Sequence, residues 1–311
     1  MVREGFNTDL RCQREWGWLL AIWLFLSGTA SALFLYFRIF SLPPFIAQLS
    51  LGLLLLGGLV LLLEQGNPAR AWRAPLRVRT SWLSRGVLFV SAFVVSCFFY
   101  LAPEFLSWLP WDANSVSGQA LAWIATLCAL MIILYPGFFL AKNRSIPFWN
   151  TLLLPAIFVT YAALGGAATL LIGGAFLGEG LRQFGSLAAA LLVLNFVVFA
   201  VYLLVMHRAG GPARESVRLL NRAPLSWSLR IGVVGVGMVL PLAMLLGPSS
   251  LEAPAGACIL VGSLLLRYCL LKVGVYIPTA LVEGVDFSRL NRSGDDLERE
   301  YRSVAGRYAN G

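Results

Sequence analysis

The chain has 311 residues, of which 59% are hydrophobic and 13% are charged, and its formal net charge is +9. Soluble domains usually carry about 25% charged residues, so this composition excludes an ordinary soluble domain and indicates a polytopic membrane protein. The positive charge does not require a nucleic-acid partner, because the arginines lie between apolar runs, where the positive-inside rule accounts for them.

A helix that crosses a bilayer needs about 20 predominantly apolar residues, and the sequence contains eight runs of this kind. The predicted fold is therefore an all-α integral membrane protein with eight transmembrane helices. In chain order the predicted spans are residues 16–40, 45–64, 85–101, 119–141, 148–176, 186–206, 229–246 and 255–277.

Small residues at 27–31 in the first span predict that a neighbouring helix comes close there. The second span ends on Glu64, and an arginine-rich loop follows it. Tyr135-Pro136-Gly137 lies in the last third of the fourth span, where the proline frees a backbone carbonyl. Asn195, in the middle of the sixth span, is expected to form hydrogen bonds across helices.

A short sequence motif, Pro-Ala-Arg, occurs twice, each time after a predicted span. Pro68-Ala69-Arg70 follows the second span and Pro212-Ala213-Arg214 follows the sixth. We interpret the chain as two related four-helix halves, residues 1–147 and 148–277, with a cytoplasmic tail at 278–311. The halves are not equivalent, because Glu64 of the first corresponds to His207-Arg208 of the second.

Most of the 24 Lys and Arg residues lie in the N-terminal segment, in the loops after the second, fourth and sixth spans, and in the tail. This bias predicts an inner-membrane protein with both termini in the cytoplasm. A basic face complementary to an acidic partner subunit is the competing explanation.

Glu64 is a candidate catalytic residue. A carboxylate that closes an apolar span can take or give a proton, because desolvation disfavours its charged form. The alternative is that Glu64 lies at the lipid–water boundary and pairs with Arg70 or Arg73.

Tyr135 is predicted to approach the same membrane face, as are Trp16 and Trp18 at the start of the first span. Aromatic side chains and one acid at a common depth would suit the pocket of a flat aromatic ligand. Taken singly, each aromatic residue is better explained as part of an interfacial belt, which also contacts membrane lipid, and only their coincidence with Glu64 favours a binding pocket.

Two further groups bear on chemistry. Arg267 lies deep in the eighth span, where a charge is expected to meet a polar group or a lipid headgroup. His207 is the only histidine, whereas a transmembrane b-type haem usually requires two axial histidines, so no haem is expected.

Several motifs resemble the membrane-anchor family of polysulfide reductase, the NrfD-like subunits. They are Trp16-x-Trp18, the acid followed by Asn67-Pro68-Ala69-Arg70, Tyr135-Pro136-Gly137 with Asn143, and Pro147-Phe148-Trp149-Asn150. Together they cover most of the first five spans. A member of this family carries Asn and His in its first span after the tryptophans, where this chain has apolar residues and Trp23.

The resemblance implies a haem-free subunit of a molybdenum or tungsten iron–sulfur oxidoreductase. Its first four helices would hold menaquinone or ubiquinone, with Glu64 as the acid and Tyr135 as the phenol that bonds a quinone oxygen. Iron–sulfur clusters and molybdopterin would belong to partners: a four-cluster ferredoxin-like subunit and a molybdopterin catalytic subunit. The predicted quinone-binding residues are Trp16, Trp18, Trp23, Glu64, Arg70 and Tyr135.

The family's quinone-side face bears the N-terminus and the loop after the second span, which here is the basic face. The iron–sulfur subunit is therefore expected to dock from the cytoplasm and to pass electrons from a cytoplasmic substrate into quinone. Two other functions stay open: an ion or small-molecule transporter or proton-translocating subunit, which repeated halves would suit, and an anchor that only tethers a complex.

Overall fold

The structure, a computed structural model, describes residues 12–64, 81–106, 108–177 and 183–276. Its α-helices are α1 (Trp18–Phe40), α2 (Pro44–Glu64), α3 (Trp82–Leu101), α4 (Val116–Ala141), α5 (Leu153–Leu177), α6 (Gln183–Arg208), α7 (Gly211–Leu220), α8 (Leu225–Trp227), α9 (Leu240–Leu245) and α10 (Glu252–Lys272). A π-helix, η4 (Ser228–Val239), joins α8 to α9, and two 3₁₀ segments are η2 (Ala102–Glu104) and η5 (Ser249–Leu251).

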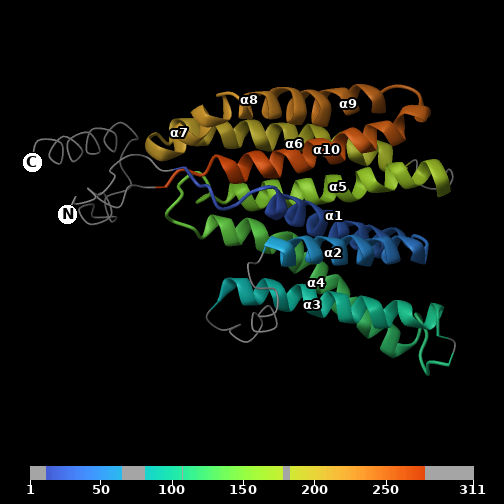
Figure 1. Ribbon diagram of the computed structural model, residues 1–311. Coiled ribbons are helices and arrows are strands. Elements are labelled where there is room, and N and C mark those ends of the chain that lie inside the picture. Colours follow the sequence, from blue (N-terminus) through green and yellow to red (C-terminus); the bar gives the residue numbers. More distant parts are fainter. Residues whose placement is uncertain (1–11, 65–80, 107, 178–182, 277–311) are drawn as a thin grey trace, which may run out of the picture.

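Eight helical segments of the described residues are long and apolar enough to cross a membrane, with α8, η4 and α9 together forming one of them. They run side by side along a common direction (Figure 1). Length and hydropathy thus agree with the eight predicted spans, and the prediction of an all-α membrane protein is confirmed.

The bundle is built around α1, α5 and α10, each of which is more than half buried over its most apolar stretch. Helices α3 and α4 lie on one side of this centre, and α6 with the η4–α9 segment lies on the other (Figure 1). Because α5 packs against both α1 and α4, the two proposed halves share an extensive contact. Their division at residue 147 stays a prediction.

Small residues allow α1 and α5 to approach closely. A Cβ added at Gly165 of α5 would lie 2.5 Å from the Thr29 hydroxyl of α1, and one at Gly166 would lie 3.0 Å from the Ala32 Cβ. The small-residue run at 27–31 therefore does receive a neighbouring helix. Asn195 of α6 likewise bonds across helices, accepting from Thr160 Oγ1 at 2.8 Å and donating to the Thr160 carbonyl.

The two ends of the described chain meet at one end of the bundle. Cys12 forms an antiparallel bridge with Val275, and the Gln13 N–H donates to the Gly274 carbonyl at 2.7 Å. With eight crossings between them, the segments before α1 and after α10 share one side of the bundle. Which side of the membrane this is stays a prediction, and the tail at 278–311 lies outside the described residues.

Helix α5 begins at Leu153, five residues after the start of the predicted span at 148. The preceding residues form turns that are fixed by buried contacts: Trp149 Nε1 donates to the Leu270 carbonyl at 2.9 Å, and the Tyr202 hydroxyl donates to the Phe148 carbonyl at 2.6 Å.

The basic segment after α6, predicted as a loop, contains helix α7. Residues 65–80, which carry the first basic loop, lie outside the described residues.

Candidate functional site

A small cavity opens among α1, α3 and α4. Its volume is about 20 Å³, and its lining is mainly apolar, with the hydroxyls of Ser27 and Tyr135 and the indole of Trp23 as its polar side-chain groups. The lining residues are Trp23, Ser27, Gly86, Phe89, Val90, Ile132, Tyr135 and Pro136.

Tyr135 is the central polar group of this cavity. Its hydroxyl is buried and has no hydrogen-bond partner, and the same holds for the Ser27 hydroxyl from α1. Buried hydroxyls are normally paired, because an unmade hydrogen bond costs the desolvation free energy of the group. Two unpaired hydroxyls that line one cavity are therefore suited to a ligand with an oxygen acceptor.

Gly86 of α3 allows the Tyr135 ring to lie against the backbone of that helix. A Cβ at this position would lie 2.6 Å from the Tyr135 Cε1 and Cζ atoms. The two residues after Tyr135 also serve the site: Pro136 lines the cavity, while Gly137 packs so closely on Pro155 of α5 that no side chain would fit there. Tyr135-Pro136-Gly137 thus joins the cavity to the α4–α5 contact.

Stacked aromatic rings lead from Tyr135 to the end of the bundle where Cys12 and Val275 pair. Tyr135 stacks on Phe139 with 5.7 Å between ring centroids, Phe139 stacks on Trp16 at 6.3 Å, and Trp16 stacks on Trp149 at 5.1 Å. Trp16 lies before the start of α1 and does not line the cavity. Its connection to Tyr135 is through the Phe139 ring. Tyr135 is six residues from the end of α4, a distance of roughly 9 Å along the helix axis.

The structure brings Trp23 and Tyr135 together and connects Trp16 to them. Trp18 lies elsewhere: it stacks on Tyr268 of α10 at 3.8 Å and is 45% exposed. Glu64 is the last residue of α2 and lies two turns beyond Gly57, which packs against Trp23, but the Glu64 side chain is not among the described groups. Arg70 lies outside the described residues.

Sequence reasoning did not find Ser27, Gly86 and Phe89. Ser27 was visible only as part of a small-residue run, and Gly86 only as a glycine at the start of a span. Their role depends on which helices are neighbours, and hydropathy does not determine that.

A quinone headgroup fits the chemistry of this lining, because two of the lining residues, Ser27 and Tyr135, carry unpaired hydroxyl donors and others are aromatic. It does not fit the present volume, since about 20 Å³ holds roughly one water molecule. Binding a ring therefore requires the side chains that line the cavity to rearrange.

Comparison with known proteins gives consistent matches over most of the sequence. The chain is 27% identical over 307 residues to Protein NrfD of Escherichia coli (strain K12), a match that covers 83% of this chain and 94% of that protein. It is 24% identical over 312 residues to a component of polysulfide reductase from Wolinella succinogenes, covering 87% and 96%. A shorter match, 28% over 153 residues and 46% of each protein, links it to a component of sulfite dehydrogenase from Allochromatium vinosum.

The family model described as polysulphide reductase, NrfD matches residues 8–279. This range includes all eight membrane-crossing helices of the described residues and the whole lining of the cavity. The chain is therefore a multi-pass membrane protein that belongs to the NrfD polysulphide reductase family.

Proposed function

We propose that the chain is the membrane-anchor subunit of a molybdenum or tungsten iron–sulfur oxidoreductase and exchanges electrons and protons with membrane quinone. Its partners would be a four-cluster ferredoxin-like subunit and a molybdopterin catalytic subunit, and electrons from a cytoplasmic substrate would reduce the quinone. Family membership supports an anchor role, and two relatives are named as parts of a polysulfide reductase and of a sulfite dehydrogenase.

The observation that carries the quinone part of the proposal is the Tyr135 hydroxyl, which is buried without a partner in a cavity that it shares with Trp23 and Ser27. A phenol in that position can donate a hydrogen bond to a ring oxygen, and the indole and Phe89 can flank the ring. The largely apolar lining matches the usual character of cofactor pockets.

Quinone, when bound, supplies the two-electron redox chemistry. Tyr135 would hold a ring oxygen, and Ser27 would offer a second donor from α1. Glu64 would exchange the protons at the end of α2, and Arg70 would contribute to quinone binding. The stacked rings of Phe139, Trp16 and Trp149 run from the cavity toward the end of the bundle where Cys12 pairs with Val275. In this proposal the iron–sulfur subunit docks on that end.

The test is the substitution Tyr135→Phe in the complex purified from its native membrane. Removing the donor should lower quinone-linked turnover about tenfold or more, because one hydrogen bond to a charge-developing oxygen is lost, while the partner subunits still co-purify. Turnover and the set of co-purifying partners are measured on the same preparation.

Tyr36→Phe is the matched control. The Tyr36 hydroxyl donates to the Ala163 carbonyl at 3.0 Å, near the opposite end of α1, so its loss should leave quinone turnover unchanged. Unchanged turnover in Tyr135→Phe and in Glu64→Gln, with the complex intact, would instead assign the protein a tethering role alone.

A further inference from the structure

Arg267 is a fully interior cation. Its side chain projects from α10, is 3% exposed, and lies where α10 meets α1 and α5. The guanidinium faces Gly28 of α1, where an added Cβ would come within 3.3 Å of Nη2, and it lies 5.7 Å from the Phe25 ring. A lipid headgroup has no access to this position.

The guanidinium uses only part of its donor capacity. Nη1 donates to the Ser263 carbonyl at 3.0 Å, whereas Nε and Nη2 have no acceptor. No Asp or Glu whose side chain the structure describes pairs with Arg267. The Phe25 ring gives partial compensation through a cation–π contact. A buried charge without a counter-ion is strongly disfavoured, so this site has an unmet requirement for negative charge.

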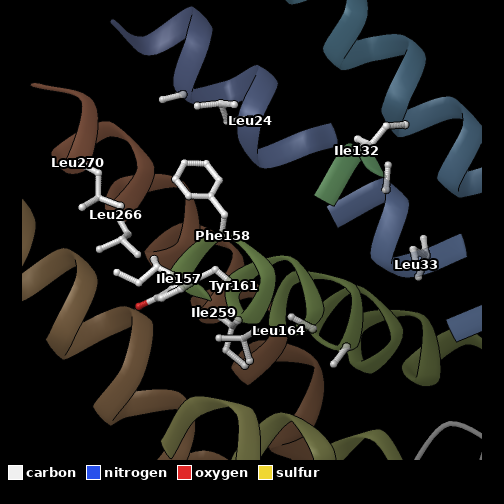
Figure 2. Packing of buried hydrophobic residues seen from close by; sticks show 14 of the residues in the cluster. Leu24, Leu33, Ile132, Ile157, Phe158, Tyr161, Leu164, Ile259, Leu266 and Leu270 are labelled. Atoms are coloured by element: carbon white, nitrogen blue, oxygen red, sulfur yellow. The ribbon is translucent and has the colours of Figure 1, made fainter. Parts of the chain in front are cut away.

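Two hydroxyls beside Arg267 are also unpaired. Ser263 lies one turn before it on α10. Tyr161 of α5 directly precedes Ala162, and a Cβ added at Gly28 would lie 3.4 Å from the Ala162 Cβ and 3.3 Å from Arg267 Nη2. Figure 2 shows Tyr161 among Ile157, Ile259 and Leu266, so apolar side chains surround this phenol. Both hydroxyls are buried without a partner, like the free guanidinium nitrogens.

We propose that Arg267, Tyr161 and Ser263 form a binding site for a small monovalent inorganic anion such as chloride. The unused N–H and O–H groups are all able to donate, and a single water has too few lone pairs and no charge to satisfy them. One compact anion accepts from all of them and neutralises the cation. The absence of a side chain at Gly28 leaves Nη2 free to approach from α10.

The experiment measures the thermal stability of the full-length protein, purified in mild detergent, in chloride and in gluconate at equal ionic strength. An anion that binds only the folded protein raises its stability with a saturable dependence on concentration. We expect such a rise in chloride and none in gluconate. Arg267→Gln should abolish it, whereas Arg230→Gln, at an exposed arginine that donates to Asn221, should keep it.

Binding of radioactive chloride provides a second readout that does not depend on whether Arg267→Gln folds. Wild-type protein should bind it saturably, and Tyr161→Phe should weaken that binding by about tenfold through loss of a charge-assisted donor. A wild type that binds no chloride and responds equally to both salts would overturn the proposal, as would a folded Arg267→Gln that responds like wild type. Neither readout uses quinone, so the result is independent of the proposed function.

Discussion

The position of Tyr135 depends on a residue that has no side chain. Gly86 lets the phenol lie flat against α3, and the hydroxyl stays in the cavity without a protein partner. Because the contact is with a ring rather than with rigid backbone, a larger residue at 86 would displace Tyr135 before it separated α3 from α4.

Gly86→Ala should therefore impair the site while preserving the fold. A methyl group 2.6 Å from two ring carbons forces the phenol to shift, and misplacement of a positioning group by about 1 Å can cost up to a hundredfold in rate. Quinone-linked turnover should fall about tenfold to a hundredfold, with normal assembly of the complex.

Gly52→Ala supplies the control for this substitution. Gly52 lies in α2, and a Cβ there would meet no atom within 4 Å, so the change has the same chemistry without the contact. Equal turnover in both variants would show that Gly86 does not position Tyr135.

At the scale of elements, hydropathy predicted where the helices are in the sequence. It did not predict which helices pack together, where each helix begins, or which hydrogen-bonding pattern it has. The third and fourth helices begin three residues before the predicted spans, because Ser81 and Ser115 accept N-terminal hydrogen bonds from Ser84 and Gly118. The π-helix η4 was not predicted, since an i→i+5 bonding pattern has no signature in apolar composition.

The candidate site could be predicted only in part for the same reason. Tyr135 and Trp23 stood out as residue types in spans, but the cavity also needs Ser27, Gly86 and Phe89, which meet only when α1, α3 and α4 assemble. Trp16 and Trp18 are close in sequence yet lie on different sides of the start of α1, so one stacks on Trp149 and the other on Tyr268.

Helix η4 depends on a glycine contact with α10. A Cβ on Gly237 would lie 2.5 Å from the Gly262 Cα, and this contact is with backbone, so only separation of the two helices would relieve it. Gly237→Ala should lower the free energy of unfolding by about 1–3 kcal/mol, the usual cost of overpacking. The loss would be seen as a lower melting temperature in detergent.

Gly235→Ala tests whether the effect is specific to that contact. Gly235 lies on the same π-helix, but a Cβ there would make only an ordinary contact of 3.4 Å with the Arg230 carbonyl. If both variants lost the same stability, the cause would be the change of residue type in η4 and not the approach to α10.

At the scale of the whole molecule, α1 separates two polar interiors. The Ser27 and Tyr135 hydroxyls lie among α1, α3 and α4, while Arg267 lies among α1, α5 and α10, on the side of Gly28. Two adjacent residues of α1 thus border different sites: Ser27 lines the cavity and Gly28 lies against Arg267. The candidate quinone site thus lies among helices of the first half of the sequence, and the buried cation lies where α10 meets α1 and α5.

The orientation of the bundle decides from which compartment a partner docks. The end where Cys12 meets Val275 also carries α7, with Arg218 in its last turn and Arg222 just after it (Figure 1). Both arginines pair with Glu215, and the positive-inside rule predicts that this end lies in the cytoplasm. In a variant without the native cysteines, Arg222→Cys should react with a membrane-impermeant maleimide only after the cells are permeabilised.

Ser250→Cys reports on the opposite end of the bundle. Ser250 is exposed in the 3₁₀ turn before α10, so this variant should react in intact spheroplasts. Labelling in the reverse pattern would place the basic end outside the cytoplasm. The proposed iron–sulfur subunit would then dock from the exported side.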